Sequence, residues 1–91
     1  MPSRFGVRVE LTTRFQRAFN KLPQHLQRLA VQRAGLFAAN PHNPRLRTHK
    51  LKGKLQEFWS FSVTESHRVL VTFPEARVAI LHDVGTHDIY R

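Results

Sequence analysis

The chain has 91 residues, and its fifteen lysine and arginine residues outnumber its six aspartate and glutamate residues, which gives a formal net charge of +9. A chain of this length forms a single domain, residues 1–91. It has no cysteine, which excludes disulfides, thiolate metal sites and cysteine nucleophiles. It also has no apolar run near the roughly 18 residues of a membrane span and no apolar signal segment, so we expect a cytoplasmic protein without a membrane partner.

The first half of the chain predicts one strand and two helices. Apolar and polar residues alternate from Phe5 to Leu11, as in a strand with one buried face. The threonine pair at 12–13 offers an N-cap for a helix whose apolar face runs from Phe15 to Leu22. Pro23 suits the first turn of a second helix, which should end near Asn40 because a proline follows it. The two helices are expected to form a hairpin.

The second half predicts three strands and a short tail. The strands are expected at Leu55–Val63, Arg68–Phe73 and Val78–Val84, and the tail at Gly85–Arg91. Tight turns between the strands indicate an antiparallel meander, which the first strand joins beside the last. The predicted fold is α+β in the order β-α-α-β-β-β, with the helical hairpin on one face of a mostly antiparallel four-stranded sheet and the other face partly open.

The segment between the second helix and the next strand, residues 41–54, is the most basic part of the chain. Its prolines and glycine predict a loop, and it contains no acidic residue. Loops of this kind often hold binding residues, and most of the cations of the chain are arginines, whose planar forks pair with phosphate. A polyanion such as nucleic acid is therefore the expected partner, although a solvated charged surface has the same composition. The cations of this segment are Arg45, Arg47, Lys50, Lys52 and Lys54.

The residue types restrict the chemistry. There is no glycine-rich phosphate loop and no acidic cluster for Mg²⁺; a metal site at His82 and His87 with their neighbouring aspartates is a weak alternative. Histidine, arginine and lysine suit metal-free cleavage of RNA by its own 2′-hydroxyl, in which histidines move protons and cations stabilise the phosphorane. A basic module that only binds RNA has a similar composition.

Several segments resemble the RelE/ParE superfamily of bacterial toxins. They are the run from Arg45 to Leu55, the motif Phe58-Trp-Ser-Phe61, the motif Ser66-His-Arg-Val-Leu70 and the ending Val84-Gly-Thr-His-Asp-Ile-Tyr-Arg91. The order of elements is also that of the superfamily. The resemblance implies the RelE-like fold and the toxin of a type II toxin–antitoxin module. RelE-like members, including YafQ and YoeB, cut mRNA in the ribosomal A site without a metal or other cofactor, and an antitoxin blocks them.

The resemblance implies a role for four residues in particular. His49 matches a position that is catalytic in YafQ and YoeB and is expected to be the general base, and His87 matches the catalytic histidine of YafQ and is expected to be the general acid. The two histidines can also exchange these roles. Arg68 matches the arginine that contacts the scissile phosphate. Tyr90 matches the C-terminal aromatic residue that stacks on or orients a base.

The resemblance also implies partners. Lys50, Lys52 and Lys54 look like the lysines that hold mRNA and 16S rRNA phosphates in RelE, and Arg45 and Arg47 are expected to attract RNA. An acidic antitoxin is the expected protein partner. Two alternatives remain open: a ParE-like toxin that binds DNA gyrase without catalysis, against which the tail motif counts, and a degenerate member without activity.

Overall fold

A computed structural model describes residues 6–90 of the protein. Phe5 and Arg91, which belong to the predicted first strand and tail, lie outside the described residues. The elements in chain order, with η for a 3₁₀ helix, are β1 (Arg8–Leu11), α1 (Thr13–Asn20), α2 (Gln24–Ala39), η2 (Pro44–Leu46), β2 (His49–Lys50), η3 (Gly53–Leu55), β3 (Trp59–Ser62), β4 (Arg68–Glu75), β5 (Val78–Gly85) and η4 (His87–Tyr90). None of the described helices is long and apolar enough to span a bilayer.

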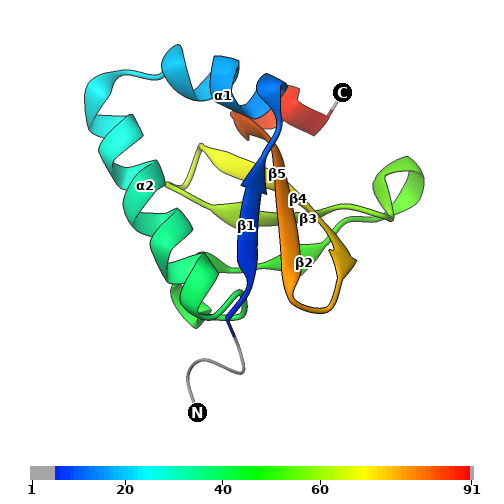
Figure 1. Cartoon of the computed structure of the whole chain (residues 1–91). Coiled ribbons are helices and arrows are strands. Elements are labelled where there is room, and N and C mark those ends of the chain that lie inside the picture. Colours follow the sequence, from blue (N-terminus) through cyan, green and yellow to red (C-terminus); the bar gives the residue numbers. More distant parts are fainter. Residues whose placement is uncertain (1–5, 91) are drawn as a thin grey trace.

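The strands form one sheet in the order β1-β5-β4-β3-β2 (Figure 1). β1 lies parallel to β5, and the other neighbours are antiparallel. This confirms the α+β class, the order of the predicted elements and the place of the first strand beside the last. The predicted number of strands was too low by one, because His49 and Lys50 pair with β3 inside the segment predicted as a loop.

The boundaries of the middle strands also differ from the prediction. β3 begins at Trp59 rather than Leu55, because Gly53 takes a left-handed φ of +70° and starts the 3₁₀ helix η3. This helix belongs to a loop that projects away from the sheet (Figure 1). β4 continues through Pro74 to Glu75, so the turn before β5 is shorter than predicted.

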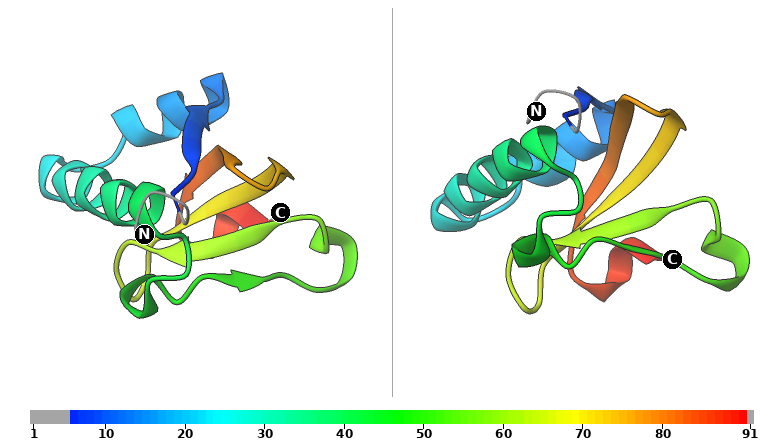
Figure 2. Two further views of the ribbon diagram at one scale, coloured as in Figure 1. Left: turned by 60° about the horizontal axis from the view of Figure 1, so that its bottom comes forward. Right: turned by 90° about the horizontal axis from the view of Figure 1, so that it is seen from below.

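The helices form as their sequence patterns predict. The side chain of Thr12 caps α1 by accepting a hydrogen bond from the backbone N–H of Phe15 at 3.0 Å. α2 ends at Ala39, with Asn40 as its C-cap before Pro41, as expected. Phe37 of α2 is fully buried and its ring stacks on Phe61 of β3, with 4.5 Å between the centroids. Both helices therefore cover one face of the sheet, and η4 lies on the other face (Figure 2).

An irregularity in β5 changes which residues enter the core. Val69 of β4 lies opposite Val84, and Val71 lies opposite Leu81. β5 therefore has one extra residue between these two pairs, which is a β-bulge. The alternation of side chains that a regular strand would show across Val78–Val84 is therefore broken beyond Leu81. Val84 joins the core face instead of sharing a face with His82, and it is almost fully buried.

Candidate active site

Two alternate serines of β3, Ser60 and Ser62, lie on the face of the sheet that the helices leave uncovered. Phe61, between them, points into the core. Ser60 is fully buried, and each serine hydroxyl bonds to the side chain of a predicted catalytic residue. The polar side of β3 therefore supports a candidate active site.

Tyr90 is held by the first of these serines. Its phenol oxygen lies 2.8 Å from the Ser60 hydroxyl oxygen, so η4 is fixed to the sheet. Ile89 is also buried, and its side chain packs so closely on Gly85 that a Cβ added there would lie 3.0 Å from it. These contacts fix the tail on the open face of the sheet.

Arg68 is held by the second serine. It is opposite Ser62 in the β3–β4 pair, and its guanidinium donates a 2.7 Å hydrogen bond to the Ser62 hydroxyl. The residue is half-buried. One hydrogen bond leaves most of the five donors of an arginine side chain for a ligand, which is the arrangement that an arginine on a phosphate requires.

His49 faces the same side of the sheet. It lies opposite Ser60 in the β2–β3 pair, and directly opposed residues of antiparallel strands project to the same side. Its Nδ1 lies 2.9 Å from the carbonyl oxygen of Arg47. Because a carbonyl oxygen only accepts, Nδ1 carries the proton and Nε2 of the neutral ring is free to accept one. This is the tautomer of a general base.

His87 is exposed at the start of η4. The centroid of its ring is 6.2 Å from that of Tyr90, in an edge-to-face arrangement. The four predicted catalytic residues are thus arranged around two serines: His49 opposite Ser60, Tyr90 bonded to Ser60, His87 beside Tyr90, and Arg68 bonded to Ser62.

A third histidine, His82, lies at the extra residue of β5. Its Nε2 is 2.7 Å from the Thr72 hydroxyl, and its ring meets the edge of Phe58. Burial lowers the pKa of His82, and the positive charge of Arg14 lowers it further. Its ring is packed and hydrogen-bonded.

The predicted cations separate into two groups. Lys50 lies opposite Trp59, on the reverse side of β2 from His49, and Lys52 and Lys54 are exposed on the projecting loop. Arg45 and Arg47 instead line a small pocket together with Arg33 of α2. Across residues 6–90, no three histidine, aspartate or glutamate side chains gather as a metal site.

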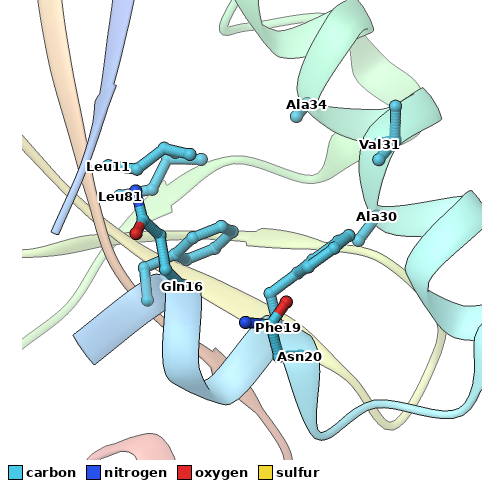
Figure 3. Close-up of a pocket in the computed structure, with 9 residues that line it drawn as sticks. Leu11, Gln16, Phe19, Asn20, Ala30, Val31, Ala34 and Leu81 are labelled. Atoms are coloured by element: carbon cyan, nitrogen blue, oxygen red, sulfur yellow. The ribbon is translucent and has the colours of Figure 1, made fainter. Parts of the chain in front are cut away.

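An apolar groove opens between α1 and α2, next to β1 (Figure 3). Its volume is about 460 Å³. Leu11 of the edge strand and Val31 of α2 lie in its wall with 47% and 62% of their surfaces exposed. Large apolar side chains that stay exposed around a groove are typical of a protein-binding surface.

The sequence matches no family model and no curated protein, but solved structures share the fold. The toxin–antitoxin complex RelBE2 of Mycobacterium tuberculosis superposes with a TM-score of 0.76 at 23% identity, over 90% of this chain and 99% of that one. YafQ of E. coli gives 0.75 at 11% identity, over 92% and 97%. The archaeal RelE–RelB complex of Pyrococcus horikoshii gives 0.69 at 15%, over 89% and 94%.

The fold is that of the RelE/ParE toxins. This confirms the fold that the sequence motifs implied. Three residues near the candidate site were not predicted from the sequence to be functional: Ser60, Ser62 and Arg33. The sequence indicates the serines only weakly, through their alternation on the polar side of a strand. Arg33 falls at the spacing of the buried positions of a helix and so resembles a packing residue.

Proposed function

We propose that this protein is the toxin of a type II toxin–antitoxin module and that it cleaves mRNA on the ribosome. The observation that carries the proposal is the arrangement of Arg68, Tyr90 and His49 around the serines of β3, on the face of the sheet that the helices leave open. The RelE-like fold supports it, because the similar structures include toxin–antitoxin complexes.

The proposed reaction is a transesterification within the RNA, in which the phosphoryl group passes from the 5′ oxygen to the 2′ oxygen. Nε2 of His49 accepts the proton of a 2′-hydroxyl, and the freed oxygen forms a bond to the adjacent phosphorus. The bond from phosphorus to the 5′ oxygen breaks, and His87 donates a proton to that oxygen. The products are a 2′,3′-cyclic phosphate and a 5′-hydroxyl, and no cofactor takes part.

Two further residues stabilise this reaction in the proposal. The guanidinium of Arg68 contacts the non-bridging oxygens, whose negative charge grows as the phosphorane forms. Tyr90 presents its ring to the base beside the scissile bond, since its hydroxyl is already bonded to Ser60. The lysines at 50, 52 and 54 attract the phosphates of mRNA and 16S rRNA.

The proposed protein partner is an acidic antitoxin. The apolar groove between α1 and α2 would accept an apolar segment of it, and exposed arginines of both helices, such as Arg17 and Arg28, would attract its acidic side chains. Acidic residues of the antitoxin are also expected to cover Arg45 and Arg47. Because binding relieves the repulsion among these cations, complex formation should raise the melting temperature; an unchanged value would contradict this partner.

The proposed nuclease is tested by primer extension on a translated reporter mRNA after brief induction of the protein. The comparison is with a variant that carries His49→Ala and His87→Ala, and with a matched control that carries His25→Ala and His42→Ala. Breaks are expected with the native chain and the control but not with the first variant. Growth arrest without breaks would contradict the nuclease and indicate a bound target such as gyrase.

A further inference from the structure

A second cationic site adjoins Arg68. Arg33 of α2, Arg45 of η2 and Arg47 line a pocket of about 160 Å³. Ser62 belongs to the wall of this pocket and also accepts the hydrogen bond of Arg68. The pocket and the proposed catalytic arginine are therefore neighbours that share one side chain.

The guanidinium of Arg33 has a buried N–H donor without a hydrogen-bond acceptor among the described residues. Its Nε is buried, and no atom of residues 6–90 accepts a hydrogen bond from it. Buried donors in folded proteins nearly always have partners, because a donor that loses water without a replacement destabilises the fold. Because Arg33 also lines the pocket, we take its unsatisfied side chain as a sign that the pocket receives an acceptor from outside the chain.

Arg47 is held in the pocket wall by an unusual backbone conformation. Its φ of +53° lies in the left-handed region, which is unfavourable for a residue with a Cβ, and it ends the 3₁₀ helix η2. Its N–H bonds to the carbonyl of Pro44 at 3.3 Å, and its own carbonyl accepts from His49. The residue thus links the pocket to the proposed general base.

The charge of the pocket favours an anion. Glu65 is the one acidic residue among those that line it, and within residues 6–90 it forms no ion pair with the three arginines. Three guanidinium groups against one carboxylate leave an excess of positive charge. The hydroxyls of Ser62 and Thr64 add donors of the kind that contact phosphate oxygens.

We propose that this arginine pocket binds an RNA phosphate next to the scissile one. The inference rests on the proposed function, because Arg68 is taken to hold the scissile phosphate. Arginine forks bind phosphate through paired hydrogen bonds, and the shared Ser62 places the pocket one side chain away from Arg68. A carboxylate of a protein partner has similar chemistry, but the direct continuity with Arg68 and His49 favours the RNA backbone.

The test measures binding of an uncleavable RNA, a short single-stranded oligonucleotide with 2′-O-methyl groups throughout, by fluorescence anisotropy at several NaCl concentrations. Arg33→Gln is expected to weaken binding roughly tenfold, the effect of one charge-assisted contact. It should also reduce the slope of log affinity against log salt by about 0.7, the value for one phosphate of a single strand. Arg28→Gln is the matched control, because Arg28 is on the same helix but is exposed and outside the pocket. It should change the affinity and the salt slope much less than Arg33→Gln does.

A second variant separates binding from folding. Arg47→Gly removes a cation of the pocket and relieves the left-handed φ, so it should keep or raise the melting temperature while it weakens RNA binding. Equal RNA binding by Arg33→Gln, Arg47→Gly and Arg28→Gln would contradict the proposed phosphate binding by the pocket, even if the protein cleaves mRNA. Loss of binding to an oligoglutamate peptide alone, with RNA binding intact, would overturn it in favour of a protein ligand.

The two proposals fail separately. If the native protein produces no breaks in mRNA while Arg33→Gln still weakens binding of the uncleavable RNA more than Arg28→Gln does, the pocket is shown to bind an RNA phosphate and the proposed nuclease activity is contradicted.

Discussion

The phenol of Tyr90 and the fully buried hydroxyl of Ser60, thirty residues apart in the sequence, share a hydrogen bond of 2.8 Å. This contact joins the last described residue of the chain to β3, the strand next to the β2 edge of the sheet. It places the ring of Tyr90 beside the strand pair that presents His49. The 3₁₀ helix η4 is thereby held against the candidate site.

Removal of this hydrogen bond is expected to lower both the cleavage rate and the free energy of unfolding. Ser60→Ala and Tyr90→Phe should each lower the free energy of unfolding by about 1 kcal/mol, the usual worth of a hydrogen bond, and should lower the cleavage rate by roughly tenfold. The double variant should be little worse than either single one, because both changes remove one contact. Urea unfolding and reporter cleavage measure the two effects. Ser66→Ala, an exposed serine in a turn, is the control, and strictly additive losses would contradict the coupling.

The close packing of Gly85 on Ile89 gives a second way to disturb the tail. A methyl group at Gly85 would lie 3.0 Å from the Ile89 side chain, so Gly85→Ala should displace η4 and lower cleavage severalfold. Gly35→Ala is the matched control. Gly35 lies in α2 with no atom within 4 Å of an added Cβ, so this change should stabilise the protein by roughly 0.5–1 kcal/mol and leave cleavage unchanged. An unchanged Tyr90 fluorescence in Gly85→Ala would show that the contacts of η4 are unaltered and would contradict its expected displacement.

The ion pair between Arg14 and Asp83 connects α1 to the irregular part of β5. The two groups are 3.1 Å apart, and the Asp83 side chain is 10% exposed whereas the Arg14 side chain is 68% exposed. Asp83 also accepts a hydrogen bond from the N–H of Val84 at 2.9 Å. Asp83→Ala should therefore cost about 1–3 kcal/mol, because it leaves a buried N–H without a partner. Arg14→Ala should cost less than about 1 kcal/mol, as exposed partners do. Urea unfolding compares them, and equal losses would contradict the stated role of the buried N–H.

Much of the fold could be predicted from local patterns. Three features depend only on neighbouring residues: the alternation in the strands, the cap at Thr12 and the helix end before Pro41. Each of them predicted an element that the structure contains. The extra residue of β5 could not be predicted, because it depends on the pairing of Val69 with Val84, which lie on different strands. For the same reason the two-residue strand at His49 was predicted as a loop.

The candidate site was partly predictable. Residue types and motifs identified the titratable and charged side chains, but not what holds them. The bonds from Ser60 to Tyr90 and from Ser62 to Arg68 arise only when β3 meets the tail and β4. Arg33 illustrates the same limit, since its helical spacing places it on the inner face of α2, and only the tertiary structure shows that it meets Arg45 and Arg47 there.

Acid is expected to destabilise the protein through His82. Its pKa in the folded protein is lowered by burial and by Arg14, while in the unfolded chain it has the ordinary value of about 6.5. Above that value the ring is neutral in both states and the full stability is present. As the pH falls below about 6.5, the unfolded chain takes up the proton first, so the free energy of unfolding decreases until the pH passes the lowered folded value.

The measurement is the melting temperature of the native protein and of His82→Gln between about pH 7.5 and pH 5. The native protein should lose more stability over this range than the variant, because glutamine does not titrate and its amide can still bond to the Thr72 hydroxyl. His25→Gln, an exposed histidine of α2, is the control and should retain the acid sensitivity of the native protein. If His82→Gln and the native protein lost the same stability, the neutral, packed state of His82 would not be the source of the acid sensitivity.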